Sequence, residues 1–382
     1  MFLFGYPHVP RWSTGVHDRL ECSALYLNDG ENHALFIAHD LIFVPREMAV
    51  AARERIARQT GVPEHAIMLT ATHTHSGPIT VDFLSNASDP VVPKADARYL
   101  AQLVDVCVET ALRAVRSAEP AEIGRSVVSV AGTGTNRQDP NGVADRAVPL
   151  LVARARDSQR VIAAMVVHAM HPTVLHEDST CISGDFPHFT RALLRSGALP
   201  ADCPFLFHQG ASGDQSPRHV TRGNTFAEAQ RVGEILGRAF AAALPGLTFS
   251  PALRVRNATR TIDLRSRQFP GIEAAERAVN AARARFELLR ESGAPAPSVR
   301  TAECDVFGAE EAAELAHAAK DGRLADVIAG RTPAEIQVLS VGDWNFVGWP
   351  GEFFVDYALE VRRRAPGTYV VTLSNGELQG YI

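Results

Sequence analysis

Two histidines stand two residues apart in the stretch LTATHTHSGP, at His73 and His75, and a Ser-Gly-Pro turn follows them at once. The apolar alternation before them predicts a strand, which would carry both imidazoles on one face. Imidazole nitrogens bind transition metals and also carry protons near neutral pH. Two hydrogen-bonded histidines at a strand end explain the pattern equally well. A metal or catalytic role therefore requires further ligands from elsewhere in the chain.

Two further ligand candidates follow predicted strands. His171 closes the apolar run VIAAMVVHAMHPTVL, where Pro172 ends regular structure. His168 lies three residues earlier, so a strand would turn it to the opposite face, and we interpret it as a hydrogen-bonded core residue. Glu352 follows a Pro-Gly pair in GWPGEFF, at the start of a predicted helix. An acid there suits either the helix dipole or a metal ligand held by a rigid turn.

Two polar loops carry groups for acyl chemistry. HQGASGDQSPRH presents Ser216 after the strand PFLF, and TNRQDPNG contains Arg137. The first loop has neither a GxSxG nor a P-loop pattern, and in isolation each loop is consistent with a plain turn. The fixed planar cation of Arg137 suits a carboxylate or an oxyanion.

Composition excludes several classes of protein. The chain has 382 residues, 46% of them hydrophobic, and a net charge of -5. The sequence has no stripe of basic residues, which argues against nucleic-acid binding. It also has no apolar run of the ~18–20 residues that a membrane span requires. The start, MFLFGYPHVPRW, lacks an early Lys or Arg, which predicts no signal peptide. Five scattered cysteines without a CxxC pair predict reduced thiols and a cytoplasmic location.

Periodicity predicts the elements that position these groups. A hairpin is expected at 23–44, and further strands at 66–75, 161–175, 204–207, 252–265 and 369–375. Helices are expected at 46–61, 96–118, 189–197, 225–244, 271–291 and 309–319. Residues 334–364 are expected to form two strands, a turn and a helix. Strands and helices alternate without a clean βαβ rhythm. We therefore expect an α/β fold of the α+β type, with mixed sheets covered by helices in a single large catalytic domain over 1–382, and a peripheral helical excursion at 266–330.

Read in order, the motifs ATHTHSGP, NRQDPNG, HPTVL…ISGDFP, QGASGDQSP and PGEF resemble the N-terminal catalytic domain of the neutral/alkaline ceramidases. The early segment GVHDRLECSALYL…IAHDLIFV resembles the opening of that domain. The similarity extends over nearly the whole chain and is weakest in 266–330. The resemblance implies a zinc site made by the residues that match the family's ligands, namely His73, His171, Glu352 and Tyr381. It also implies that His75 faces the substrate, that Arg137 lies in the same site, and that Ser216 is a nucleophile or a hydrogen-bonding group.

The predicted function is a cytoplasmic, zinc-dependent amidohydrolase that cleaves an N-acyl amide. The family's glycines after HTHSGP are replaced by ITVDF, and Ile79, Val81 and Phe83 are expected to narrow the entrance. No basic amphipathic helix or aromatic-rich insertion predicts stable membrane anchoring. We therefore expect a soluble N-acyl amide, with a carboxylate that pairs with Arg137, rather than ceramide. Two alternatives stay open: an acyltransferase that works through Ser216, and a non-catalytic, zinc-stabilised binding protein.

Overall fold

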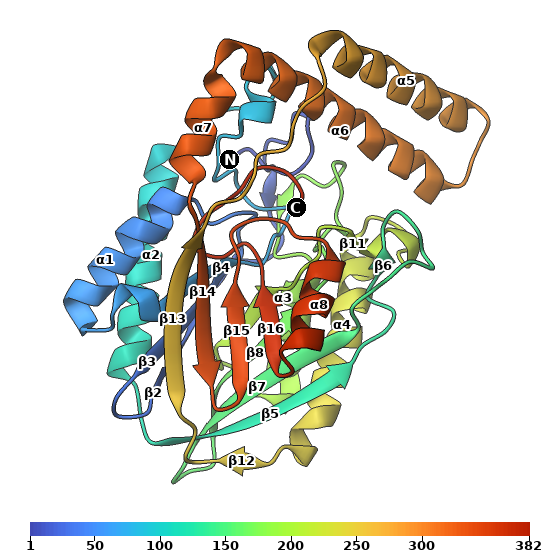
Figure 1. The fold of residues 1–382 in the computed structure, drawn as a ribbon. Helices are drawn as coiled ribbons and strands as arrows, with labels where there is room; N and C mark the ends of the chain where they lie inside the picture. The colour runs from blue at the N-terminus through green and yellow to red at the C-terminus, as the bar shows by residue number, and fades with distance from the viewer.

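Three larger β-sheets stack in the body of the molecule, and helices cover them (Figure 1). The computed structural model describes residues 1–382. No helix combines the length and apolar character needed to cross a bilayer. The mixed sheets and covering helices confirm the predicted α+β fold class.

The sheets contain both parallel and antiparallel pairs. The five-stranded sheet has the order β10 (Phe205–Gln209), β8 (Val161–His168), β7 (Ala147–Ala155), β5 (Ala121–Ser129) and β12 (Phe249–Ser250). The four-stranded sheet has the order β13 (Val255–Ile262), β14 (Ala334–Val341), β15 (Trp344–Gly348) and β16 (Thr368–Val371). The three-stranded sheet has the order β2 (Cys22–Asn28), β3 (His33–His39) and β4 (Ile67–Ala71). Two short pairs join β1 (Gly15–Val16) to β9 (Cys181–Ile182), and β6 (Thr135–Asn136) to β11 (Gln215–Ser216).

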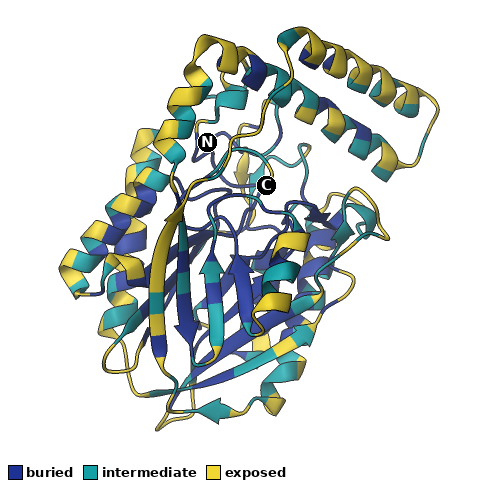
Figure 2. Ribbon diagram, in the orientation of Figure 1, coloured by how far each residue is buried: buried dark blue, intermediate teal, exposed yellow.

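Helices pack on the outer faces and over one end of the sheets (Figure 1). The three-stranded sheet is covered by α1 (Arg46–Thr60) and α2 (Ala97–Arg116), and the five-stranded sheet by α3 (Phe186–Leu193) and α4 (Phe226–Ala243). Helix α8 (Val355–Arg364) packs against β16. The end that holds both termini carries α5 (Ile272–Glu291), α6 (Ala296–Asp321) and α7 (Arg323–Arg331). Figure 2 shows that α5 is largely exposed, whereas the central strands are buried.

The central strands of the five-stranded sheet are buried on both faces. In β8, Ala164 and Val166 join the cluster under α3 and α4, while Met165 and Val167 join the cluster between the sheets. Successive side chains of a strand alternate between its faces, so a strand covered on both sides is apolar at every position. This explains the continuous apolar run in the sequence.

Most expected elements are present, and the errors lie at element ends. The hairpin, α1 and α2 are confirmed, whereas β5 and β7 were not predicted. The strand expected at 66–75 ends at Ala71, and the strand expected at 161–175 ends at His168. Helix α6 starts at Ala296, well before the expected residue 309, because Pro297 lies in its first turn, where a missing N–H costs no helical hydrogen bond.

Candidate metal centre

His73 lies two residues beyond the end of β4, in irregular backbone and not on a strand face. Its φ of 70° is in the left-handed region, which reverses the chain direction after the strand. The backbone N–H of His73 donates to the carbonyl of Leu41, and its Nδ1 lies 2.9 Å from the carbonyl oxygen of Ile42. A carbonyl only accepts, so Nδ1 carries the proton, and Nε2 presents a free electron pair.

His171 is fixed in the same way from another part of the chain. It follows β8, and its Nδ1 lies 2.7 Å from the carbonyl of Ser212 and 3.0 Å from that of Gln215. Its Nε2 therefore also presents an electron pair. His168, by contrast, is buried elsewhere with its Nε2 3.0 Å from the hydroxyl of Thr133, as expected for a core residue.

The Glu352 carboxylate meets both imidazoles. Its Oε2 lies 3.2 Å from Nε2 of His73 and 3.0 Å from Nε2 of His171. Ligands about 2.0–2.1 Å from a tetrahedral metal are separated by about 3.3–3.4 Å, so these separations fit a metal site in its donor set and its size. Helix α8 begins only at Val355, so Glu352 lies in the preceding turn, outside the helix in which it was expected.

His75 completes a group of three buried or half-buried imidazoles with His73 and His171, whose nitrogens lie within 4.8 Å of one another. This group could hold a metal. His75 Nε2 is 3.3 Å from His73 Nε2, but its buried Nδ1 has no hydrogen-bond partner. No carbonyl fixes the His75 ring as one fixes each of the other two. Instead it packs on Gly5, where a Cβ would lie 2.6 Å from the ring's Cγ.

The charge states agree with metal binding. Burial lowers the pKa of His171 to about 4, and burial together with His73 lowers the pKa of His75 well below its usual value. Burial would raise the pKa of Glu352, but His73 and His171 hold it well below its usual range. At pH 7 His75 and His171 are therefore neutral imidazoles and Glu352 is a carboxylate, and these are the forms that bind divalent metals.

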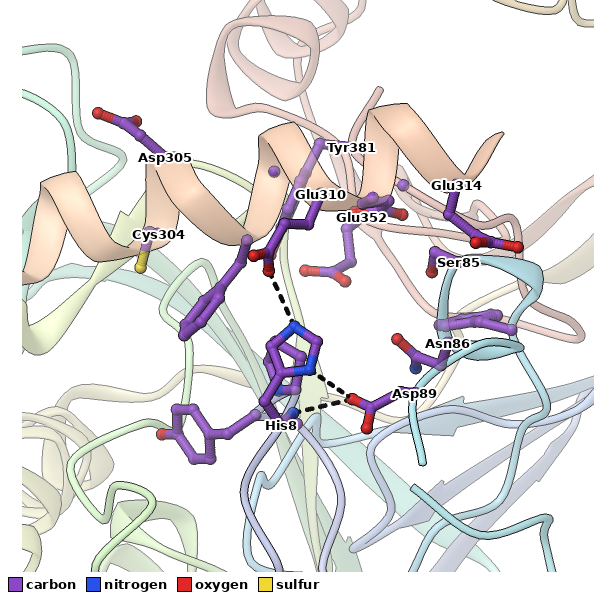
Figure 3. A pocket seen from close by; sticks show the side chains of 18 of the residues that line it. His8, Ser85, Asn86, Asp89, Cys304, Asp305, Glu310, Glu314, Glu352 and Tyr381 are labelled. Atoms are coloured by element: carbon purple, nitrogen blue, oxygen red, sulfur yellow. Dashed lines mark hydrogen bonds and ion pairs between the residues drawn. The ribbon is translucent and has the colours of Figure 1, made fainter. Parts of the chain in front are cut away.

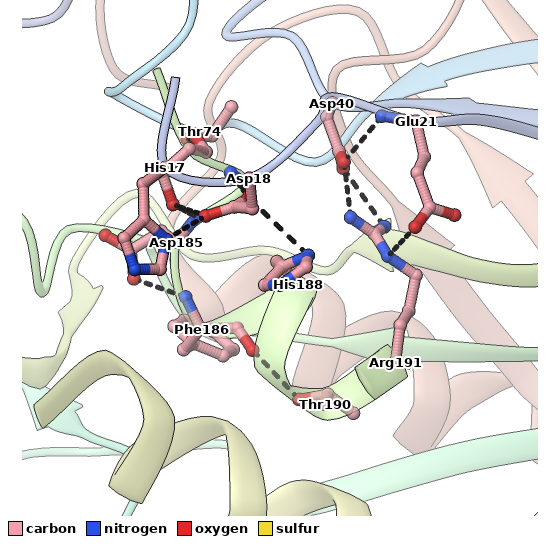
Figure 4. A network of polar contacts seen from close by, with 12 residues as sticks. His17, Asp18, Glu21, Asp40, Thr74, Asp185, Phe186, His188, Thr190 and Arg191 are labelled. Atoms are coloured by element: carbon pink, nitrogen blue, oxygen red, sulfur yellow. Dashed lines mark hydrogen bonds and ion pairs between the residues drawn. The ribbon is translucent and has the colours of Figure 1, made fainter. Parts of the chain in front are cut away.

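The SGDFP motif holds the histidine loop in place (Figure 4). The hydroxyl of Thr74 donates to the carbonyl of Ser183 at 2.7 Å, and the Ser183 N–H donates to the carbonyl of Ser76. The Ser183 hydroxyl in turn donates to Asp18 at 2.6 Å. Farther along α3, the buried Arg191 pairs with Asp40. The contacts to Asp18 and Asp40 are charge-assisted and largely buried, and together with the neutral hydrogen bonds of Thr74 and Ser183 they rigidify the loop that carries His73 and His75.

Short strands β6 and β11 join the two polar loops next to the histidines. The backbone N–H of Arg137 donates to the carbonyl of Asp214 at 2.7 Å, and the Asp214 carboxylate accepts from Asn136 and from the N–H of Val355. This brings Arg137 and Ser216 to the same cavity wall. The hydroxyl of Ser216 accepts from the N–H of Arg218 at 3.3 Å, and no histidine hydrogen-bonds to it.

Tyr381 lies beside Glu352. The two residues form a parallel bridge, with the N–H of Ile382 donating to the carbonyl of Glu352 and the N–H of Phe354 donating to that of Ile382. Both bonds tie down the C-terminal residues. The ring of Tyr381 faces the guanidinium of Arg137, 4.5 Å from its centroid. Its role as a metal ligand stays a prediction.

A cavity of about 840 Å³ opens from these residues, and α6 forms one wall of it (Figure 3). Its size is within the usual range of small-molecule sites. At the rim, His8 contacts Asp89 at 3.1 Å and Glu310 at 2.8 Å. The expected helical excursion at 266–330 thus includes a helix, α6, that lines this cavity.

The expected narrowing of the entrance is only partly correct. Phe83 lines the cavity. Ile79 and Val81 are buried in the core beneath α1 and α2 instead, because their apolar side chains gain more from packing there than at a polar wall.

Sequence reasoning missed the residues that support His75 from the N-terminal segment. The ring of Tyr6 packs edge-on against His75, and its hydroxyl donates to the carbonyl of Leu175. Arg11 donates to the carbonyl of His75 at 2.7 Å. No local pattern links these residues to a histidine more than sixty positions away. The unusual GYP turn at Gly5, whose φ is 123°, is the one signal that could have suggested a close approach.

The chain is similar to known proteins over much of its length. Residues 1–224 match the family described as neutral/alkaline non-lysosomal ceramidase, N-terminal. Neutral ceramidase of Mycobacterium tuberculosis is 25% identical over 245 residues, which are 56% of this chain and 37% of that protein. Neutral ceramidase A of Dictyostelium discoideum is 26% identical over 58% of this chain and 34% of its own length. The match thus spans little more than a third of each curated relative.

The fold is similar to that of a solved structure. The crystal structure of neutral ceramidase from Pseudomonas aeruginosa aligns with 100% of this chain and 66% of its own, with a TM-score of 0.70 and 16% identity. At this identity the alignment supports the fold alone.

Proposed function

Because this chain belongs to the neutral/alkaline non-lysosomal ceramidase family, we propose that it is a zinc-dependent amidase that hydrolyses an N-acyl amide. The observation that carries the proposal is the convergence of three donor atoms: Oε2 of Glu352 lies 3.2 Å from Nε2 of His73 and 3.0 Å from Nε2 of His171. Two imidazoles and a carboxylate are a donor set that zinc enzymes use, and zinc can expand to five ligands, which would admit water beside a fourth protein ligand.

Zinc is the proposed metal, and Tyr381 is its proposed fourth ligand. When bound, the ion supplies Lewis-acid activation of water and of the amide carbonyl. The tie between Tyr381 and Glu352 supports this assignment, because the C-terminal bridge holds the two residues together.

The other residues act on protons and charge. His75 is neutral at pH 7 and has an unpaired Nδ1, so it can take a proton and deliver it to the leaving amine. Arg137 lines the same cavity and can stabilise negative charge on the amide oxygen or on a product carboxylate. Ser216 has no basic partner, which supports a hydrogen-bonding role over a nucleophilic one. The geometry therefore supports hydrolysis better than acyl transfer through Ser216.

The proposed substrate is a soluble amide of moderate size and not long-chain ceramide. Charged side chains line much of the cavity, among them Arg137, Arg300, Glu310 and Glu314, and they favour a polar ligand over two long alkyl chains. We also propose one catalytic domain over residues 1–382, with the helices of 266–330 forming part of its site. A cytoplasmic location stays a prediction.

A mass-spectrometric screen of N-acyl amides tests this function. The panel pairs N-acyl amino acids and amines with short-chain and long-chain ceramides, and the wild type is compared with His73→Ala. We expect hydrolysis of soluble members by the zinc-loaded wild type and none by the variant. Highest kcat/KM for long-chain ceramide would overturn the substrate proposal. Tight zinc binding with no hydrolysis of any member would favour a binding protein instead.

A further inference from the structure

Three arginines crowd one wall of the cavity, next to Ser216: Arg137, Arg218 and Arg300. Arg300 is neutralised, because its guanidinium lies 3.0 Å from Glu177 and 2.6 Å from Glu303. Neither Arg137 nor Arg218 has a carboxylate within the 4.0 Å of an ion pair. Neither guanidinium is therefore paired with a carboxylate in direct contact. Arg137 lies over the ring of Tyr381, and against the effect of burial Tyr381 and the more distant Glu352 raise its pKa, whereas Arg218 has no such support.

The contacts of Arg218 fix its position without neutralising it. Its Nη1 donates to the hydroxyl of Thr301 at 3.1 Å and to the carbonyl of Arg137 at 3.2 Å. Its Nη2 lies 3.1 Å from the Sγ of Cys304. These partners hold the guanidinium between the Ser216 loop and α6, with Nε left without a hydrogen bond. The charge is positioned but uncompensated.

The electrostatic cost of this arrangement points to a ligand. Burial lowers the pKa of Arg218; Cys304 acts against this, while the positive charges of Arg137 and Arg300 lower the pKa further, and the net shift is downward. Half-buried like charges are unfavourable unless an anion meets them. The planar guanidinium fork matches the oxygens of a carboxylate or a phosphate, so such a group on the ligand would neutralise the wall.

Building on the proposed amidase activity, we infer that Arg218 and Arg137 form an anion subsite that selects amides carrying a carboxylate or phosphate group. Arg218 is the specificity-determining residue of this subsite. Its anchors Thr301 and Cys304 belong to α6, beyond the residues 1–224 that match the family, whereas His73 and His171 lie within them. The part of the chain outside the match thus contributes to the choice of substrate.

Matched substrate pairs test the subsite by kinetics. Each pair has one anionic and one neutral member: N-butanoylglycine against N-butanoylglycinamide, the N-propyl monoamide of glutaric acid against the corresponding N-propyl glutaramide, and N-butanoyl phosphoethanolamine against N-butanoylethanolamine, which lacks the phosphate. The pairs separate a carboxylate on the amine side, a carboxylate on the acyl side and a phosphate. The variants are Arg218→Gln, Arg218→Lys and the control Arg283→Gln. Arg283 also lines the cavity, but Glu310 already neutralises it at 2.5 Å.

We expect the wild type to prefer the charged member of at least one pair. Arg218→Gln should reduce that preference about ten-fold or more, since a hydrogen bond to a charged group is worth a factor of this size. Arg218→Lys should retain part of it, and Arg283→Gln should retain all of it. An equal loss on charged and neutral members in Arg218→Gln would mean that Arg218 only supports α6, and it would overturn the inference. So would a wild type that hydrolyses the neutral members without any preference.

A second readout does not depend on hydrolysis. Alkylation of Cys304 by iodoacetamide, followed by peptide mass spectrometry, reports on the space beside Arg218. Glutarate and inorganic phosphate serve as probes. At least one should slow alkylation several-fold in the wild type but not in Arg218→Gln. If the amide panel is not cleaved at all, the proposed function fails, yet protection of Cys304 would still support the subsite. Equal alkylation with and without both anions would contradict it.

Discussion

The contact between Gly5 and His75 gives a direct test of whether the position of the His75 ring matters. A Cβ added at Gly5 would lie 2.6 Å from Cγ and 2.9 Å from Cβ of His75. Carbon atoms pack best at about 3.5–4.0 Å, so the ring of Gly5→Ala has to retreat by roughly 1 Å. A misplacement of about 1 Å in a catalytic group lowers the rate on the order of 100-fold.

The same substitution also strains the backbone. Gly5 has a φ of 123°, a conformation that costs a residue with a Cβ roughly 1–3 kcal/mol. Gly30→Ala is the matched control, because its φ is 95° but nothing lies within 4 Å of the added Cβ. Both variants should lose stability in urea unfolding. Only Gly5→Ala should lose kcat.

The assay combines steady-state hydrolysis of the best amide with zinc analysis. We expect Gly5→Ala to retain zinc, because carbonyl oxygens still hold Nδ1 of His73 and His171. Unchanged kcat in Gly5→Ala would refute the proton-transfer role of His75. An equal loss of kcat in Gly30→Ala would show that backbone strain, and not the displaced ring, limits the rate.

Three further predictions concern Ser216, the C-terminus and a buried histidine. Ser216→Ala should retain zinc and lose at least ~100-fold in rate. It should also lose about 1 kcal/mol of stability, because the Ser216 hydroxyl no longer accepts from the Arg218 N–H. A peptide with an acylated Ser216, found by mass spectrometry after acid quenching of the wild type during turnover, would contradict the non-nucleophilic role. Deleting Tyr381 and Ile382 removes the bridge to Glu352 and should weaken zinc binding about 10–100-fold in chelator competition, whereas unchanged affinity would exclude Tyr381 as a ligand. Burial lowers the pKa of His168 to about 4, whereas a histidine in the unfolded chain has a pKa of about 6.5. Between these two pH values the folded state therefore binds fewer protons than the unfolded state. The stability that neutral His168 contributes is therefore present above pH 6.5 and is lost as pH falls towards 4, and His168→Gln should flatten this dependence by about 1.4 kcal/mol per pH unit in urea titrations; an unchanged slope would contradict the assignment.

The order of short motifs in the sequence was the strongest guide to the site. It brought His73, His171 and Glu352 together across nearly 280 positions, and the structure has the three side chains in contact. Strand periodicity was a weaker guide. It placed His73 and His75 on one face of a strand, but that strand ends at Ala71. The left-handed backbone of His73 and the contact of its ring with the carbonyl of Ile42 set the ring position instead, and neither is visible as periodicity.

Contacts between distant segments could not be predicted from local pattern. Gly5 meets His75, and Arg218 meets Thr301, only after the whole chain has folded. Such pairs leave no mark in propensity or hydropathy, which report on neighbours in sequence. The same limit explains why α6 was expected at the periphery: its polar surface is typical of a solvated helix, yet part of that surface faces a polar cavity.

Zinc stoichiometry of His171→Ala, measured by plasma mass spectrometry alongside amide hydrolysis, tests the metal centre most directly. His168→Gln is the control, since His168 is buried three residues away and contacts Thr133 rather than the cluster. We predict one zinc per chain in the wild type and the control, and loss of both zinc and hydrolysis in His171→Ala. One tightly bound zinc per chain in His171→Ala, or full hydrolysis by metal-free wild type, would contradict the account.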